Sequence, residues 1–175
     1  MKTGIALIGF MGTGKTVVGR LLAEKLGKSF IELDAEIEKK AGKPVAAIFR
    51  EDGEASFRKM EAQMIASISA RKNTVVACGG GIVLDKSNVF RLKQEYVIVC
   101  LSATPAVILE RISGEQDKRP LLDVADKSKK IGELLSARRP LYEQAADITI
   151  ETSGIAPPGV VQKIIGALKK YESQN

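Results

Sequence analysis

An eight-residue segment near the N-terminus constrains the fold of this chain more than any other feature. Residues 9–16 read GFMGTGKT and match the pattern GxxxxGK[ST], whose glycines let backbone N–H groups converge on phosphate oxygens. The apolar run at 4–10 predicts a strand before the loop, and apolar residues at helical spacing as far as Leu26 predict a helix after it. Gly27 is suited to end that helix. A strand, a glycine loop and a helix in this order predict an α/β fold.

The rest of the chain alternates β-branched apolar runs with amphipathic segments. Further strands are predicted at 29–33, 74–78, 95–101 and 147–151, and helices at 34–41, 44–50, from 57 onward, around 89–92, at 105–112, 128–142 and 160–168. Five strands alternating with helices predict three layers, a parallel sheet with helices on both faces. The polar stretch at about 113–126 is longer than most connections and is predicted to be a lid. With 175 residues, the chain is expected to form one domain, 1–175.

Composition removes several classes of protein. The chain has no histidine, which excludes an imidazole base and leaves a zinc site short of its usual ligands. Cys78 and Cys100 lie inside apolar runs and are expected to be buried thiols of a reducing compartment. Because glycines break the apolar stretch after Lys2 and no run suits a membrane span, we expect a cytoplasmic protein without a membrane partner. The net charge of +6 leaves nucleic acid a minor alternative that we do not expect, and 5% aromatic residues favour a monomer.

The glycine loop predicts a nucleoside triphosphate site. The backbone of Gly12, Thr13 and Gly14 is expected to surround the phosphates, Lys15 to reach the β and γ phosphates, and Thr16 to hold Mg²⁺. Neither the NKxD nor the DxxG motif of a GTPase switch occurs in the chain. We therefore expect a small kinase that uses ATP as co-substrate together with Mg²⁺.

Candidate acceptor residues follow later strands of the predicted sheet. Asp34 lies where the second strand ends, the edge at which parallel sheets bind ligands, and is interpreted either as a catalytic carboxylate or as a helix N-cap. Glu32, two residues earlier on the same side of the strand, has an exposed strand position as its alternative. Arg58 and Glu61 can pair on one helix, with a surface ion pair as the alternative. The glycines at 79–81 allow a ligand to approach the backbone closely or form only a tight turn.

Taken together, these segments resemble the shikimate kinase family. The resemblance runs nearly from end to end, through GFMGTGKT, FIELDAEIE, IFREDGEASFRKME, CGGGI, DKRPLL, RRPLY and IETSGIAP. It implies the P-loop fold of nucleoside monophosphate kinases with strand order 2-3-1-4-5, and transfer of the ATP γ-phosphoryl group to the 3-hydroxyl of shikimate. The alternatives are a gluconate or nucleoside monophosphate kinase of the same fold, and a regulatory protein that binds nucleotide without phosphorylating a metabolite.

The resemblance also implies a binding site for the phosphoryl acceptor. A helical region at about 34–61 forms part of it, and later residues form the rest. Asp34 would contact the reacting hydroxyl as base or orienter, and Arg58 and Arg138 would hold the carboxylate of shikimate. Glu61 would fix Arg58. The ring hydroxyls would contact the backbone of Gly79, Gly80 and Gly81, and the pocket walls would include Phe49 and Phe57.

For the phosphoryl group and the nucleotide, the resemblance implies a second set of residues. Arg119 would close with the lid and join Lys15 and Asp34 as a catalytic residue. Arg111 and Pro157 would flank the adenine. Glu32 stands where the family usually has Asp, and its longer side chain would still reach the metal site beside Thr16.

Overall fold

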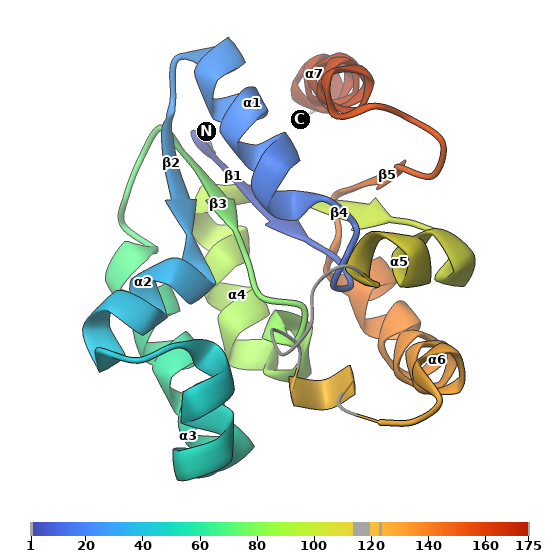
Figure 1. Cartoon of the computed structure of the whole chain (residues 1–175). Helices are drawn as coiled ribbons and strands as arrows, with labels where there is room; N and C mark the ends of the chain where they lie inside the picture. The colour runs from blue at the N-terminus through green and yellow to red at the C-terminus, as the bar shows by residue number, and fades with distance from the viewer. Residues whose placement is uncertain (1, 114–119, 123, 175) are drawn as a thin grey trace.

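Five parallel strands form the centre of the protein, seen in a computed structural model that describes residues 2–113, 120–122 and 124–174 (Figure 1). The strands are β1 (Gly4–Ile8), β2 (Ser29–Glu32), β3 (Thr74–Ala77), β4 (Tyr96–Ser102) and β5 (Ile148–Glu151). Their order in the sheet is β2-β3-β1-β4-β5, with Ile5 of β1 opposite Val75 of β3 and Val97 of β4. The implied strand order 2-3-1-4-5 is confirmed.

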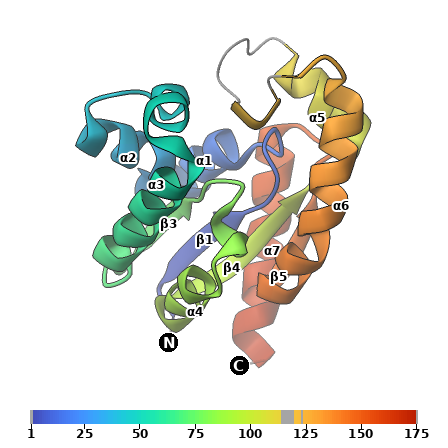
Figure 2. The ribbon, with the colours of Figure 1, turned by 90° about the horizontal axis from the view of Figure 1, so that it is seen from below.

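Helices cover both faces of this sheet (Figures 1 and 2). The helices are α1 (Lys15–Leu26), α2 (Leu33–Ala41), α3 (Val45–Ile68), α4 (Lys86–Glu95), α5 (Pro105–Ile112), α6 (Lys127–Ala145) and α7 (Pro157–Gln174), with the short 3₁₀ turns η1 (Ile82–Leu84) and η2 (Pro120–Leu122). Helices α1 and α7 pack on one face, and α3, α4 and α6 pack on the other (Figure 2). None of the helices in the described ranges is long and apolar enough to span a bilayer.

Side chains of the central strands alternate between two hydrophobic clusters. In β1, Ile5 and Leu7 contribute to the cluster with α1 and α7, while Ala6 and Ile8 contribute to the cluster with the helices of the opposite face. All five residues of β1 are buried, as expected for a strand covered on both faces. Cys78 and Cys100 are buried free thiols, which confirms their predicted burial.

Two sequence-based predictions on the acceptor side of the fold are corrected. Strand β2 ends at Glu32 because Leu33, fully buried in the core, already begins α2. Asp34 therefore lies inside the first turn of α2, and its interpretation as an N-cap is wrong. The two helices predicted at 44–50 and from 57 onward are confirmed: they are the two parts of α3, which a kink separates at Gly53, where φ is 82°.

Part of the predicted lid lies outside the described residues, namely 114–119 and 123. Within the described part of the predicted lid, η2 leads toward α6, and the side chain of Leu122 is buried.

Candidate active site

The glycine loop connects β1 to α1 and shapes the floor of a pocket. Gly12 and Gly14 have φ values of 76° and 95°, conformations that residues with a β-carbon rarely adopt. The loop ends at Lys15, where α1 begins with backbone N–H groups that have no intrahelical partner. The Lys15 ammonium donates to the carbonyl oxygens of Gly9 and Phe10 at 2.9 and 2.8 Å. A cation and a helix N-terminus thus meet at the same end of the loop, which suits a phosphate chain.

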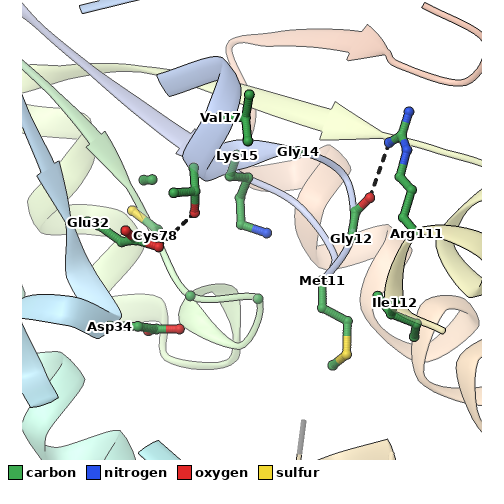
Figure 3. A pocket seen from close by; sticks show the side chains of 14 residues that line it. Met11, Gly12, Gly14, Lys15, Val17, Glu32, Asp34, Cys78, Arg111 and Ile112 are labelled. Atoms are coloured by element: carbon green, nitrogen blue, oxygen red, sulfur yellow. Dashed lines mark hydrogen bonds between the residues drawn. The ribbon is translucent and has the colours of Figure 1, made fainter. Parts of the chain in front are cut away.

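The pocket above this loop has a volume of about 300 Å³. Figure 3 shows Glu32 and Asp34 on one side of it, Arg111 and Ile112 on the other, and the Lys15 side chain between them. Of the predicted nucleotide residues, the pocket is lined by Gly12, Gly14, Lys15, Thr16 and Arg111. Thr13 lies behind the loop instead, since its buried hydroxyl donates to the Phe10 carbonyl at 2.8 Å.

Two side-chain oxygens suited to binding a metal ion lie together at the start of α1. The hydroxyl of Thr16 donates to Glu32 Oε1 at 2.8 Å (Figure 3), and Arg20 approaches the other carboxylate oxygen at 3.5 Å. The described residues contain no cluster of three or more His, Cys, Asp or Glu side chains able to hold a metal. Glu32 is half-buried at the pocket wall, so the alternative of an exposed strand position is wrong.

Arg111 connects the glycine loop to the segment after β5. Its Nη1 donates to the Gly12 carbonyl and to the Thr152 hydroxyl, both at 3.1 Å, and its Nη2 donates to the Thr152 carbonyl at 3.0 Å. Thr152 is buried and was not predicted, because nothing in the local pattern of ETSG marks a contact with Arg111. Pro157 is exposed at the start of α7 and does not line the pocket.

A second, smaller pocket of about 70 Å³ adjoins the first. Its walls come from α2, α3, the segment after β3, η2 and α6, and they are formed by Met11, Asp34, Val45, Phe49, Phe57, Arg58, Glu61, Gly79, Gly80, Gly81, Leu121 and Arg138. The two pockets share Met11, Asp34, Gly79 and Gly80. The structure thus brings all the predicted acceptor residues into one site, with Asp34 at the junction.

Arg58 is held from several sides. Its Nη1 donates to Glu61 Oε2 at 2.5 Å and its Nη2 to Glu54 Oε1 at 3.0 Å. The guanidinium also lies over the rings of Phe57 and Phe49, 5.4 and 5.9 Å from their centroids. Glu61 is only 1% exposed, so the alternative of a surface ion pair is wrong.

Burial changes the protonation of Glu61. The pKa of its carboxyl rises from 4.5 to about 7, mainly because burial removes solvent and in part because Asp34 is near, although Arg58 and Arg138 oppose the shift. Glu61 Oε1 is buried and has no hydrogen bond within the described part of the chain. The acceptor pocket therefore contains a carboxyl group that titrates near neutral pH.

The glycines after β3 allow these side chains to approach the backbone. A β-carbon on Gly79 would lie 2.6 Å from Glu61 Oε1 and 3.0 Å from Asp34 Oδ1, and one on Gly81 would overlap the Arg58 guanidinium. A tight turn alone does not require such contacts, so these glycines make room for side chains of the site, and the approach of a ligand to their backbone stays a prediction.

Arg138 completes the pocket from α6. It is 5% exposed, and its Nη1 lies 3.4 Å from the Gly80 carbonyl oxygen. Tyr142, one turn later, donates to the same oxygen at 2.5 Å. The sequence prediction missed Tyr142 and Met11, although both lie within the quoted segments RRPLY and GFMGTGKT. Arg119 lies outside the described residues.

The two pockets together suit one kind of chemistry. The larger one offers a phosphate loop and a cation, while the smaller one offers two guanidinium groups that pair bidentately with a carboxylate or phosphate. A carboxylate at their junction can orient a hydroxyl toward the end of a phosphate chain. The arrangement suits transfer of a terminal phosphoryl group to a hydroxyl of a small anion.

Comparisons with known proteins agree with this chemistry. The model of a family described as "Shikimate kinase" matches residues 11–169. The shikimate kinase of Thermodesulfovibrio yellowstonii is 49% identical over 96% of this chain and 94% of its own, and that of Persephonella marina is 44% identical over 94% and 98%. A solved structure of shikimate kinase from Acinetobacter baumannii in complex with shikimate superposes with a TM-score of 0.93, at 39% identity, over 97% of this chain and 94% of that one.

Proposed function

The chain belongs to the shikimate kinase family, and on that premise we propose how its two adjoining pockets carry out the reaction. The reaction transfers the γ-phosphoryl group of ATP to the 3-hydroxyl of shikimate and gives shikimate 3-phosphate and ADP. ATP occupies the pocket above the glycine loop, and shikimate occupies the smaller pocket. The observation that carries this assignment is the position of Asp34, which lines both pockets.

Asp34 acts on the acceptor hydroxyl. The 3-hydroxyl of shikimate donates a hydrogen bond to its carboxylate, which turns an oxygen lone pair toward the γ-phosphorus and accepts the proton as the new bond forms. The position of Asp34 in the first turn of α2 supports this assignment, because the helix holds the carboxylate at the pocket junction.

Lys15 and Arg119 neutralise the phosphates. The Lys15 ammonium exchanges its contacts with the Gly9 and Phe10 carbonyls for the β and γ phosphate oxygens. Backbone N–H groups of Gly12, Thr13 and Gly14 surround the same phosphates. We assign Arg119 to the transferring phosphoryl group from its place in the DKRPLL segment.

The oxygen donors at the base of α1 fit a Mg²⁺ ion that accompanies ATP. Thr16 Oγ1 and a carboxylate oxygen of Glu32 already lie 2.8 Å apart, and Mg²⁺ in kinases is held by one or two protein oxygens together with substrate phosphates. Bound there, the ion neutralises charge on the β and γ phosphates. Thr16 and Glu32 are the residues that would hold the ion.

Shikimate is held at its carboxylate end by Arg58 and Arg138. Planar guanidinium groups pair with a carboxylate in two hydrogen bonds and so fix the rotation of the ring as well as its position. The backbone of Gly79, Gly80 and Gly81 contacts the ring hydroxyls. Arg111, which is hydrogen-bonded to Gly12 and Thr152, flanks the adenine, and we assign Pro157 at the start of α7 to the other side of it.

The proposal extends to the protein as a whole. Residues 1–175 act as one monomeric cytoplasmic kinase domain with an acceptor-binding region at about 34–61, a lid at about 113–126, and no membrane or nucleic-acid partner. A monomer is supported by the few large hydrophobic side chains exposed in the described part of the chain, namely Val17, Leu84, Phe90 and Val124.

The test is ADP release from the purified protein with ATP and Mg²⁺, in the presence of shikimate, gluconate, AMP or no acceptor. We expect release that only shikimate stimulates. Stimulation by gluconate or AMP would overturn the assignment of Arg58 and Arg138 to the shikimate carboxylate. ATP binding without stimulation by any acceptor would instead favour a regulatory nucleotide-binding protein.

A further inference from the structure

We infer that Tyr142 is a positioning residue for shikimate, and that it acts by holding the carbonyl group of Gly80; the inference rests on the proposed function. The phenol of Tyr142 donates to the Gly80 oxygen at 2.5 Å, across 62 residues of sequence. Tyr142 lines neither of the two pockets of the active site, so its contribution passes through the groups that its hydroxyl contacts, the Gly80 carbonyl and the neighbouring Arg138.

The peptide unit that Tyr142 holds lies between the two arginines of the acceptor pocket. The Gly80 carbonyl accepts from Tyr142 and faces Arg138, both on α6. The next residue, Gly81, packs directly against the Arg58 guanidinium of α3. Because peptide units are planar and the described chain has no cis peptide bonds, fixing the Gly80 oxygen fixes the whole Gly80–Gly81 unit. Tyr142 thereby sets the position of the backbone segment that contacts both Arg58 and Arg138.

Tyr142 also competes with Arg138 for one acceptor. The two residues are four positions apart on α6, so their side chains lie on the same face of the helix. The phenol is 2.5 Å from the Gly80 oxygen, whereas Arg138 Nη1 is 3.4 Å away, at the long end of the hydrogen-bonding range. Because the phenol satisfies the carbonyl, the guanidinium can turn its donors to a carboxylate in the pocket. Without the phenol, the buried carbonyl would draw Arg138 away from the substrate.

The phenol is a permanent donor. Tyr142 is 4% exposed, and burial raises the pKa of its hydroxyl to about 12, although the nearby Arg138 opposes the shift. At any pH at which the enzyme is folded and active, the hydroxyl therefore carries its proton, and the Gly80 carbonyl keeps its partner.

The chain contains a matched control for this contact. Tyr96 is also fully buried, burial raises its pKa to about 12, and its hydroxyl donates to the carbonyls of Ile68 and Arg71 at 2.8 and 2.9 Å. These carbonyls lie at and after the end of α3, and Tyr96 lines neither pocket. Tyr142→Phe and Tyr96→Phe thus each remove one buried hydroxyl, and only the first removes a contact with the site.

We expect Tyr142→Phe to raise the KM for shikimate roughly tenfold and to leave the KM for ATP within about twofold. The reason is that the buried Gly80 carbonyl, without its phenol partner, accepts a hydrogen bond from Arg138 and so draws that residue away from shikimate. Tyr96→Phe is expected to leave both KM values within about twofold, although it lowers the melting temperature to a similar extent. Both variants keep the ring and its packing, so both are expected to fold. An unchanged KM for shikimate in Tyr142→Phe, or an equal rise in Tyr96→Phe, would overturn the inference.

A double-mutant cycle tests the route through Arg138. If Tyr142 acts by leaving Arg138 available, Tyr142→Phe should lower kcat/KM for shikimate much less in an Arg138→Lys background than in the wild type. Equal effects in the two backgrounds would exclude that route. Shikimate-dependent ADP release by the wild-type protein is measured alongside: its absence would refute the proposed function, whereas its presence with an unchanged Tyr142→Phe KM refutes the inference alone.

Discussion

Two arginines of α3 show how environment separates a binding residue from a surface residue. The side chain of Arg58 is 22% exposed, packs on two aromatic rings and lines the acceptor pocket, whereas that of Arg50 is 75% exposed and pairs with its neighbour Glu51. Both carry one positive charge on the same helix. Exchange of either arginine for lysine keeps the charge and removes the guanidinium group. Comparing the two exchanges therefore shows whether the geometry of that group matters at Arg58.

We predict that Arg58→Lys raises the KM for shikimate roughly 10- to 100-fold, because lysine keeps the charge and loses the bidentate pairing. ATP binding is expected to stay nearly intact. Arg50→Lys is the matched control and should leave both constants within about twofold. Steady-state kinetics with each substrate varied in turn provide the measurement, and comparable losses for shikimate and ATP would contradict the assignment of Arg58.

The raised pKa of Glu61 makes the free energy of unfolding of the protein depend on pH, in a direction that can be worked out. Burial raises its pKa from 4.5 to about 7 in the folded protein, so the folded state binds more protons than the unfolded state between these values. Its contribution to stability is thus complete below about pH 4.5 and is lost as the pH rises through about 7. The carboxyl groups of Glu51, Asp85 and Glu151 have pKa values lowered from 4.5, 3.8 and 4.5, so their contributions to stability are already complete across this window.

We predict that the free energy of unfolding of the wild type falls from pH 5 to 7.5 and that Glu61→Gln flattens this fall, since glutamine does not titrate. Glu54→Gln removes the exposed carboxylate bound to the same guanidinium and is expected to keep the wild-type slope. Urea denaturation at several pH values in this range measures the effect. The same slope in wild type and Glu61→Gln would show that another group carries the pH dependence.

Among the structural elements, the glycine segment after β3 contacts side chains of both α3 and α6. Gly81 has φ −96°, which alanine adopts without strain, and the three atoms nearest to an added methyl group all belong to the Arg58 guanidinium. We predict that Gly81→Ala displaces Arg58 and raises the KM for shikimate roughly tenfold, because the displaced guanidinium loses the geometry for bidentate pairing.

The control for this prediction is Gly166→Ala in α7, where an added β-carbon meets nothing within 4 Å. It should leave both KM values unchanged and stabilise the protein by about 0.5–1 kcal/mol, because alanine favours the helix. Kinetics and thermal unfolding of the two variants measure both effects. An unchanged KM for shikimate in Gly81→Ala would show that Arg58 is not held against this segment.

The elements also show how far sequence reasoning reaches. The loop between β1 and α1 was predictable because its pattern and its flanking apolar runs are local. The early start of α2 was not, because it depends on the burial of Leu33 in the core. The contacts of Arg111 with Thr152 and of Tyr142 with Gly80 join residues 41 and 62 positions apart, and no periodicity of either segment encodes such a pairing. The family resemblance supplied Arg138, whose burial and partner only the fold could show.

At the scale of the whole molecule, the two pockets proposed for the substrates meet between elements that are distant in sequence. Met11 of the glycine loop and Asp34 of α2 line both pockets, and Leu121 of η2 reaches the acceptor pocket from the segment that precedes α6. The proposed lid at 113–126 is thus attached to the acceptor pocket through η2. Binding of both substrates should therefore order this segment more than binding of either one.

We predict that backbone hydrogen exchange in peptides covering 113–126 slows severalfold when ADP and shikimate are bound together, and less with either ligand alone. ADP and shikimate are chosen because the pair fills both pockets without reacting. Peptides from the C-terminal half of α7, which packs on the opposite face of the sheet, serve as the internal control and should exchange at the same rate in every complex. Equal exchange at 113–126 in the free and doubly bound protein would refute the lid. Slowing by ADP alone to the full extent would instead make the segment part of the nucleotide site and leave the acceptor pocket open.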